Sequence, residues 1–194
     1  MNGGDVAAIV LAAGASRRLG RPKQLVLWGG EALVRRAARI ACESSCGRVV
    51  VVVGAAEREV REAIAGLRAE VVPNEEWAEG IASSIRAGVG AVDSAVEGAA
   101  LLLACDQPML TSTHLGWIVA AWRSGAKMVG SRYADTLGVP ALFDRSAFPA
   151  LLALRGDAGA KKVLQAGESV GIDWTEGELD VDTPADLERV EGLS

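Results

Sequence analysis

Short apolar runs alternate along the chain with longer amphipathic segments. The runs at residues 6–13, 49–53 and 99–105 are continuous and rich in branched or small side chains, which is typical of strands buried on both faces of a mostly parallel sheet. Between the first two runs, Leu33, Ala37 and Ile40 share one face of a helical pattern, and Val60 and Ile64 repeat the arrangement after the second run. This order predicts an α/β fold of three layers, with right-handed crossovers between parallel strands.

The rest of the chain continues the same pattern. Helices are predicted at residues 80–92 and 112–122, and strands near 127–130 and 139–143. Thr183 is a natural N-cap, with Pro184 at the first helical position and Asp186 three residues after the cap. Since no repeat, low-complexity tract or linker divides the sequence, we expect a single domain over residues 1–194. In such sheets, ligands bind beyond the carboxyl ends of the strands.

Composition narrows the chemistry that these loops can perform. The 194 residues include one histidine and three cysteines, which excludes the usual Cys₄ and Cys₂His₂ zinc sites. The net charge of −5 argues against non-specific binding to nucleic acid or to an anionic membrane. No apolar run approaches the roughly twenty residues of a membrane span. The first residues do not resemble a signal peptide, and the number of cysteines is odd, so we expect a cytoplasmic protein.

The loop after the first predicted strand combines small residues with four cations. Its sequence is Leu11-Ala12-Ala13-Gly14-Ala15-Ser16-Arg17-Arg18-Leu19-Gly20-Arg21-Pro22-Lys23. Small residues let the backbone approach a ligand, and its amides can bind phosphate while Arg and Lys neutralise the charge. The loop is neither a P-loop nor a Gly-x-Gly-x-x-Gly fingerprint. We interpret it as a phosphate-binding turn, with a solvated basic connection as the alternative.

Two acidic segments are candidates for binding a metal. Asp106 follows the third predicted strand directly, in Cys105-Asp106-Gln107-Pro108, where α/β proteins place ligand-binding groups. Asp180 and Asp182 alternate in an extended segment and so lie on one side of it. Taken alone, both segments also fit plain structural roles, a turn and a helix cap respectively.

These segments together resemble nucleotidyltransferases of the nucleotide-diphospho-sugar transferase type. The first loop resembles their Leu-Ala-Ala-Gly-x-Ser-x-Arg-Leu/Met-Gly-x-x-Lys signature, and residues 180–187 resemble their Asp-x-Asp-Thr-Pro-x-Asp-Leu element. Residues 74–84 resemble an Asn-x-x-Trp-x-x-Gly-x-x-x-Ser segment, and Cys-Asp-Gln-Pro resembles the branch that includes molybdenum cofactor cytidylyltransferases. The resemblance covers about residues 6–190 and implies a Rossmann-like α/β/α fold. One departure is Val139, where many members of that branch have His between Gly and Pro.

The resemblance implies a role for each matching residue. Lys23, Arg18 and Asp106 would be catalytic, with Lys23 and Arg18 holding the triphosphate. Asp106 and Asp182 would bind Mg²⁺, which prefers oxygen ligands, with Asp180 as a water-mediated partner. The implied nucleotide-binding residues are Leu11, Ala12, Ala13, Gly14, Ser16, Arg18, Lys23, Gly80, Ser83 and Ser84.

The implied activity is a Mg²⁺-dependent transfer of a nucleoside monophosphate. CMP would pass from CTP to a phosphorylated acceptor, molybdopterin or its molybdenum form, with release of pyrophosphate. A molybdoenzyme maturation protein is the partner that this activity suggests, and neither nucleic acid nor membrane is expected. The sequence leaves open the choice between CTP and GTP, the acceptor, the oligomeric state and whether Asp180 touches the metal.

Two other functions remain open. Nicotine blue oxidoreductase resembles this branch, so the chain could be an NAD(P)-dependent oxidoreductase of that kind. Asp106 and Asp182 argue against this reading, because carboxylates repel a dinucleotide pyrophosphate unless a metal intervenes. The other alternative is a non-catalytic molybdenum cofactor carrier or maturation factor.

The tryptophans divide into two groups. Five of the eight aromatic residues are Trp. Trp117 and Trp122 follow the helical pattern and are predicted to be core side chains, whereas Trp28 and Trp77 lie beside the expected ligand-binding segments. We expect the second pair to report nucleotide binding by fluorescence.

Overall fold

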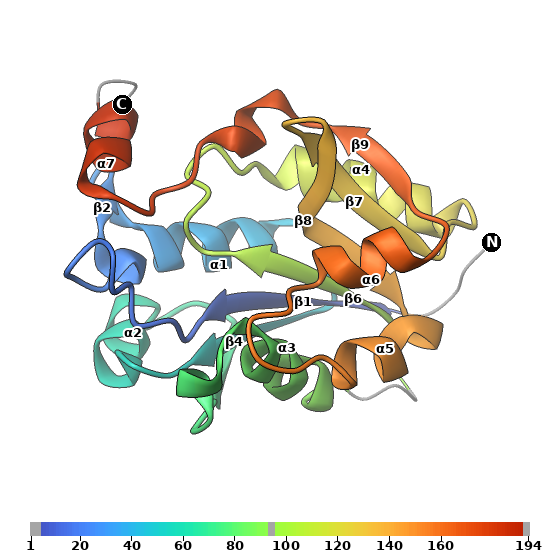
Figure 1. The fold of residues 1–194 in the computed structure, drawn as a ribbon, viewed down its shortest axis with the longest axis horizontal. Coiled ribbons are helices and arrows are strands. Elements are labelled where there is room, and N and C mark those ends of the chain that lie inside the picture. The colour runs from blue at the N-terminus through green and yellow to red at the C-terminus, as the bar shows by residue number, and fades with distance from the viewer. Residues whose placement is uncertain (1–4, 93–95, 192–194) are drawn as a thin grey trace.

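A single sheet of seven strands organises the structure, a computed structural model that describes residues 5–92 and 96–191 (Figure 1). The strand order is β5-β4-β1-β6-β8-β7-β9. Of these seven strands only β8 runs against the others, since it pairs antiparallel with both β6 and β7. The strands are β1 (Asp5–Ala12), β4 (Arg48–Val53), β5 (Glu70–Pro73), β6 (Glu97–Ala104), β7 (Met128–Tyr133), β8 (Thr136–Asp144) and β9 (Val170–Asp173).

Helices cover both faces of this sheet. They are α1 (Leu33–Glu43), α2 (Glu57–Ala63), α3 (Ile81–Gly90), α4 (Ser112–Arg123), α5 (Phe148–Leu152), α6 (Lys161–Ala166) and α7 (Pro184–Glu191). Short 3₁₀ turns lie at η1 (Lys23–Leu25), η2 (Trp77–Glu79), η3 (Arg145–Ala147) and η4 (Thr175–Glu178), and β2 (Leu27–Trp28) pairs with β3 (Glu31–Ala32) in a small hairpin.

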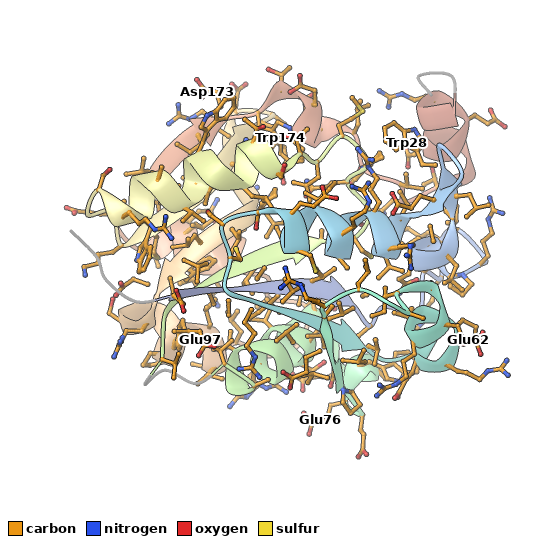
Figure 2. The ribbon with its side chains drawn as sticks, turned by 180° about the vertical axis from the view of Figure 1, so that it is seen from behind. Trp28, Glu62, Glu76, Glu97, Asp173 and Trp174 are labelled. Atoms are coloured by element: carbon orange, nitrogen blue, oxygen red, sulfur yellow. The ribbon has the colours of Figure 1, made fainter. Side chains whose placement is uncertain are left out.

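The central strand β1 shows why three layers form. Its side chains alternate between the two faces: Val6 and Val10 pack with apolar residues of α1, α2 and α4, while Ala7 and Ile9 pack with those of α3, α5 and α6. Figure 1 shows α3, α5 and α6 in front of the sheet, and Figure 2 views the opposite face, which α1 and α4 cover. The predicted three-layer, Rossmann-like fold with a mostly parallel sheet is therefore confirmed.

The predicted elements are correct in kind, with differences at their ends. The helix expected at residues 80–92 begins at Ile81 and ends at Gly90, and the final helix begins at Pro184 as expected. Its cap is reciprocal: the Asp186 amide donates to the Thr183 hydroxyl oxygen at 3.3 Å, and the Asp186 carboxylate accepts from the Thr183 amide at 2.8 Å. Strands β5 and β9 were not predicted.

Of the two tryptophans predicted to be core side chains, Trp122 is confirmed and Trp117 is wrong. Trp122 is fully buried, and its indole Nε1 donates to the Asp144 carboxylate at 3.1 Å. Trp117 in the same helix is 56% exposed, because the apolar stripe of α4 that faces the sheet is filled by Leu115, Ile118 and Val119. Helical periodicity places Trp117 on the side of α4 that is turned away from that stripe.

Within residues 5–92 and 96–191, no helix is long and apolar enough to cross a membrane. The expected absence of a signal peptide and the ends of the expected domain concern residues 1–4 and 192–194, which lie outside the described residues.

Candidate active site

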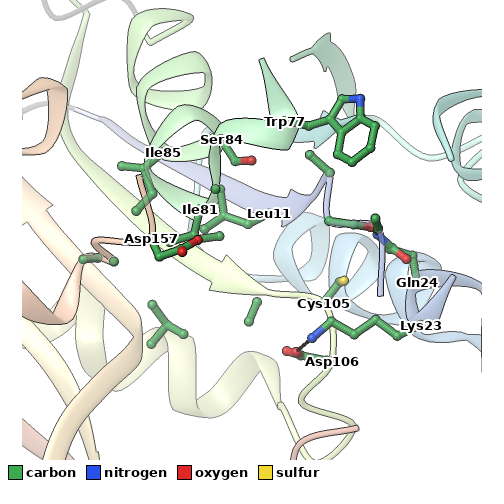
Figure 3. Close-up of a pocket in the computed structure, with 18 of the residues that line it drawn as sticks. Leu11, Lys23, Gln24, Trp77, Ile81, Ser84, Ile85, Cys105, Asp106 and Asp157 are labelled. Carbon is green, nitrogen blue, oxygen red and sulfur yellow. Dashed lines mark hydrogen bonds and ion pairs between the residues drawn. The ribbon is translucent and has the colours of Figure 1, made fainter. Parts of the chain in front are cut away.

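A pocket of about 540 Å³ lies at the carboxyl ends of the central strands β1 and β6 (Figure 3). Its walls come from the loop after β1, the η2–α3 junction, the end of β6, the β7–β8 hairpin and the turn before α6. This is the edge where ligands of doubly wound sheets bind. Seven of the residues expected at the site line it: Leu11, Ala13, Gly14, Lys23, Gly80, Ser84 and Asp106.

Three charged residues, distant in sequence, meet at one side of this pocket: Lys23 and Asp106 line it, whereas Asp182 and its partner Arg18 lie outside the lining. The Lys23 ammonium donates to Asp106 Oδ2, as Figure 3 shows, and to Asp182 Oδ1 at 2.7 Å. Arg18 donates to the other oxygen of Asp182, also at 2.7 Å, from a side chain that is 73% exposed. The two carboxylates therefore converge on one cationic point.

The pKa directions follow from this arrangement. Burial alone would lower the pKa of Lys23, but the charge and hydrogen bond of Asp106 and the hydrogen bond of Asp182 hold it above its usual value. Burial would raise the pKa of Asp182, but Lys23 and Arg18 hold it below the ordinary value. Burial, Asp106 and Asp182 raise the pKa of Asp180. Lys23 thus stays charged, and Asp180 lies within the field of both other carboxylates.

A backbone contact explains how Asp182 reaches Asp106. The Val181 amide donates to the Asp106 carbonyl at 3.0 Å, so the segment before α7 is fixed to the end of β6. The Val181 side chain is fully buried against Leu19, Val26 and Leu33. Burying an apolar side chain of this size contributes about 1.5–3 kcal/mol. The two carboxylates are therefore held together by packing as well as by charge.

The donor set at this point fits a hard divalent cation. Magnesium takes one or two protein carboxylates and completes its shell with water and phosphate oxygens, and Asp106 and Asp182 supply that number at one place. Among the described residues there is no cluster of three or more His, Cys, Asp or Glu side chains arranged for a metal. Such a site depends on oxygens from outside the protein.

The first loop is shaped by a residue that sequence reasoning missed. Gln24 is buried, and its amide donates to the Ala12 and Gly14 carbonyls at 2.9 and 2.6 Å. Its carbonyl accepts from the Ser16 hydroxyl at 3.3 Å, and the same hydroxyl accepts from the Lys23 amide at 2.9 Å. Ser16 and Gln24 thus hold the two ends of the loop together and fix the backbone amide of Lys23. The sequence feature that could have indicated this role is a Gln directly after the expected catalytic lysine.

A second buried amide organises the η2–α3 junction. Asn74 follows β5 and donates to the hydroxyls of Ser83 and Ser84 at 2.9 and 3.1 Å. Ser83 in turn donates to the Gly80 carbonyl at 2.9 Å. Ser84 faces the pocket, whereas Ser83 lies behind it, as do Ala12 and Ser16 in the first loop.

Trp77 and Trp28 occupy different surroundings. Trp77 lines the pocket opposite the first loop (Figure 3). Trp28 packs against the small cluster of Leu19, Val26, Leu33 and Val181, and its ring lies 4.4 Å below the Arg36 guanidinium. Only Trp77 is therefore in direct reach of a molecule in the pocket.

Comparison with known proteins identifies the family from the sequence. Residues 8–170 match the family described as the MobA-like NTP transferase domain. The chain is 34% identical over 170 residues to nicotine blue oxidoreductase of Paenarthrobacter nicotinovorans, covering 82% of this chain and 81% of that protein. It is 32% identical over 134 residues to a probable molybdenum cofactor guanylyltransferase of Opitutus terrae, covering 69% of this chain and 63% of that one.

The fold matches solved structures over its whole length. The crystal structure of Rv0371c from Mycobacterium tuberculosis H37Rv aligns with a TM-score of 0.85 at 30% identity, covering 97% of this chain and 98% of that one. A complex of Rv0371c with manganese aligns with a TM-score of 0.82 at 27% identity, covering 98% of this chain and 100% of that one. With the family match over most of its length, the chain belongs to the MobA-like NTP transferase family.

Proposed function

We propose that this protein transfers CMP from CTP to the phosphate of molybdopterin or its molybdenum form and releases pyrophosphate. The observation that carries the proposal is the contact of the pocket-lining residues Lys23 and Asp106 with each other and of Lys23 with Asp182, which lies just outside the lining. Two carboxylates and an ammonium at one point suit the binding of a metal and a polyphosphate together. The Cys-Asp-Gln-Pro segment at Asp106 is the feature that favours CTP over GTP.

The nucleotide is placed by the two junctions that the buried amides organise. The backbone of Ala13 and Gly14 forms one side of the pocket, and Gly80 and Ser84 form another. Base and ribose fit between these walls, where small residues allow close approach. The triphosphate then extends toward Lys23 and Arg18, whose charges offset those of the phosphates.

The reaction needs no covalent intermediate on the protein. An oxygen of the acceptor phosphate forms a bond to the α-phosphorus of CTP, the bond from that phosphorus to the β-phosphate oxygen breaks, and pyrophosphate leaves. Negative charge that develops on the α-phosphate is stabilised by the Lys23 ammonium, which is held at the pocket floor and remains protonated. A catalytic histidine is not required.

Asp106 and Asp182 would hold a Mg²⁺ ion, with Asp180 acting through water. The ion supplies charge neutralisation between the two anionic reactants. Support comes from the manganese complex of the similar protein Rv0371c and from the carboxylate oxygens that converge here. Lys23 contacts the same oxygens, so ammonium and metal compete for them.

Pyrophosphate release tests the proposal. The protein is incubated with molybdopterin, Mg²⁺ and each of CTP, GTP, ATP and UTP in turn. We expect release with CTP, loss of at least about 100-fold in Asp106→Asn, and near-normal rates in the control Asp173→Asn, an exposed residue outside the pocket lining. Release with GTP alone would overturn the choice of base, and no release with any triphosphate would overturn the function.

A second candidate is suggested by the 34% identity to nicotine blue oxidoreductase. An oxidoreductase would consume NADH or NADPH in the presence of a quinone-like substrate, which absorbance at 340 nm measures without a triphosphate. Consumption that persists in Asp106→Asn would favour this reading. Tight binding of molybdopterin without turnover would favour a cofactor carrier.

The remaining parts of the proposal concern the cellular compartment and the partner protein. Cys42, Cys46 and Cys105 are free thiols, which suits a reducing compartment such as the cytoplasm. A molybdoenzyme maturation protein is the proposed partner for the product, to be tested by co-purification.

A further inference from the structure

Two segments far apart in the sequence are joined along one wall of the pocket. The Glu79 carboxylate in η2 accepts a hydrogen bond from the Gly156 amide at 2.9 Å. The Ala82 amide in α3 donates to the Gly156 carbonyl at 3.1 Å. Both backbone groups of Gly156, which precedes α6, are therefore fixed to the η2–α3 junction.

Arg86 fixes Glu79 in turn. Its guanidinium donates to both Glu79 oxygens, at 2.9 and 2.5 Å, and to the Leu154 carbonyl at 3.0 Å. The hydrogen bonds from Arg86 and from the Gly156 amide lower the pKa of Glu79 to about 2. Glu79 thus stays anionic, and charge-assisted hydrogen bonds of this kind are stronger than neutral ones.

The joined segments pack without spare room. Gly80 has φ +129, and a Cβ built there would lie 2.5 Å from both the Asp157 carboxylate and the Gly156 carbonyl oxygen. Only glycine fits this position. A small shift of the segment 154–161 would therefore displace Gly80 in the pocket wall.

The segment that Glu79 holds forms the far side of the pocket from the charged floor. It contributes Asp157, Ala160 and Lys161 to the lining. Figure 3 shows Asp157 beside Ile81, across the pocket from Lys23 and Asp106. If the triphosphate lies at Lys23, as in the proposed function, this wall is left for the second substrate.

We propose that Glu79 is a positioning residue for the acceptor: through Gly156 it holds the segment 154–161 in the conformation that binds the phosphorylated acceptor. The inference rests on the proposed function for the identity of the two substrates. It predicts a larger effect on the acceptor than on CTP, because Glu79 hydrogen-bonds to Gly156 of that segment, whereas Ser84 on the nucleotide side is held by Asn74.

Glu79→Ala and Glu79→Gln test this role against Glu76→Gln. Glu76 also pairs with Arg86, at 3.0 Å, but it is 73% exposed and points into solvent (Figure 2). Removing the Glu79 carboxylate leaves the Gly156 amide without its acceptor. We expect the KM and Kd for molybdopterin to rise about tenfold in Glu79→Ala, less in Glu79→Gln, whose amide oxygen can still accept from Gly156, and to stay unchanged in Glu76→Gln.

Two readouts separate positioning from general destabilisation. The KM for CTP and kcat should stay within about twofold of the wild type, and amide hydrogen exchange of the peptide 154–161 should accelerate in Glu79→Ala alone. Unchanged exchange and acceptor affinity would overturn the inference, as would parallel rises in both KM values. If the wild type transfers no nucleotide, the proposed function fails, and exchange of 154–161 still decides whether Glu79 holds that segment.

Discussion

Lys23 is the counterion that Asp106 and Asp182 share. Its ammonium contacts carboxylates from the end of β6 and from the segment before α7, and both would also bind a metal. The Lys23 ammonium and a metal ion repel each other, so each weakens the binding of the other to these carboxylate oxygens. The triphosphate offers Lys23 a different set of oxygens, so nucleotide binding should release the carboxylates for the metal.

Removing Lys23 should strengthen metal binding when no nucleotide is present. In Lys23→Met we expect the affinity for Mn²⁺ alone to increase about tenfold, because Asp106 and Asp182 lose the Lys23 cation and Asp182 keeps only Arg18. Free Mn²⁺ is measured by electron paramagnetic resonance during titration. The control Lys162→Met removes an exposed cation outside the pocket and should leave the affinity unchanged. Weaker Mn²⁺ binding in Lys23→Met would show that the ammonium does not compete with the metal.

Gln24 is expected to act on nucleotide binding through the backbone. Gln24→Ala leaves the Ala12 and Gly14 carbonyls without their donor, at a cost of about 1–3 kcal/mol for buried groups. We expect the KM for CTP to rise about tenfold, while the KM for the acceptor stays the same. Gln165→Ala, at an exposed position in α6, is the control. A normal KM for CTP in Gln24→Ala would mean that the loop keeps its shape without this side chain.

At the scale of elements, the sequence predicted the strands and helices that are long and strongly patterned. The continuous runs that became β1, β4 and β6 are examples, since burial on both faces leaves no polar positions. Strands β5 and β9 have four residues each and are exposed at their ends. Such short segments show neither the alternation of a half-buried strand nor the continuous apolar run of a buried one. The antiparallel direction of β8 could not be predicted either, because an apolar run does not show whether the strand runs parallel or antiparallel to its neighbours.

The close approach of α3 to β1 gives a test at this scale. A Cβ on Gly88 would lie 2.4 Å from the Ile9 Cγ2 methyl, whereas one on Gly116 in α4 would meet nothing within 4 Å. Replacing glycine by alanine in a helix otherwise stabilises by up to about 1 kcal/mol. Forcing a methyl group into a packed core costs about 1–3 kcal/mol.

Gly88→Ala should therefore lower the free energy of unfolding, and Gly116→Ala should raise it. Urea denaturation followed by circular dichroism measures both changes against the wild type. Equal stabilisation by the two substitutions would contradict the packing of α3 on the sheet.

For the whole molecule, the sequence predicted which segments come together at the pocket better than it predicted how their side chains interact. Asp106 and Asp182 were expected together, and the Val181 contact explains why they meet. The pairing of both with Lys23, the support from Gln24 and the joining of Glu79 to Gly156 depend on contacts between distant segments. No periodicity or motif within one segment encodes such contacts.

The single histidine links overall stability to pH. His114 is buried, stacks on Trp174 at 4.8 Å, and its Nε2 lies 2.7 Å from the Ser131 hydroxyl. Ser131 donates its own proton to the Pro140 carbonyl, so His114 Nε2–H donates to the Ser131 oxygen. Burial lowers the pKa of His114 to about 4, against the opposing charge of Glu176.

Because the folded state has the lower pKa, the unfolded chain takes up the proton first as pH falls. The contribution of His114 to stability is complete above its unfolded pKa of about 6.5 and is lost between about 6.5 and 4, by about 3 kcal/mol. Urea denaturation across this range should show a steeper decline for the wild type than for His114→Gln. Parallel declines would mean that His114 does not titrate with unfolding.

The transfer of a labelled α-phosphate tests the central claim most directly. CTP carrying ³²P at the α-position is incubated with the protein, Mg²⁺ and molybdopterin, and the products are separated. The proposed function predicts label in a molybdopterin–cytidine dinucleotide, unlabelled pyrophosphate in equal amount, and neither product with Asp106→Asn. Label that stays in CTP for the wild type, with molybdopterin bound at the pocket, would contradict it.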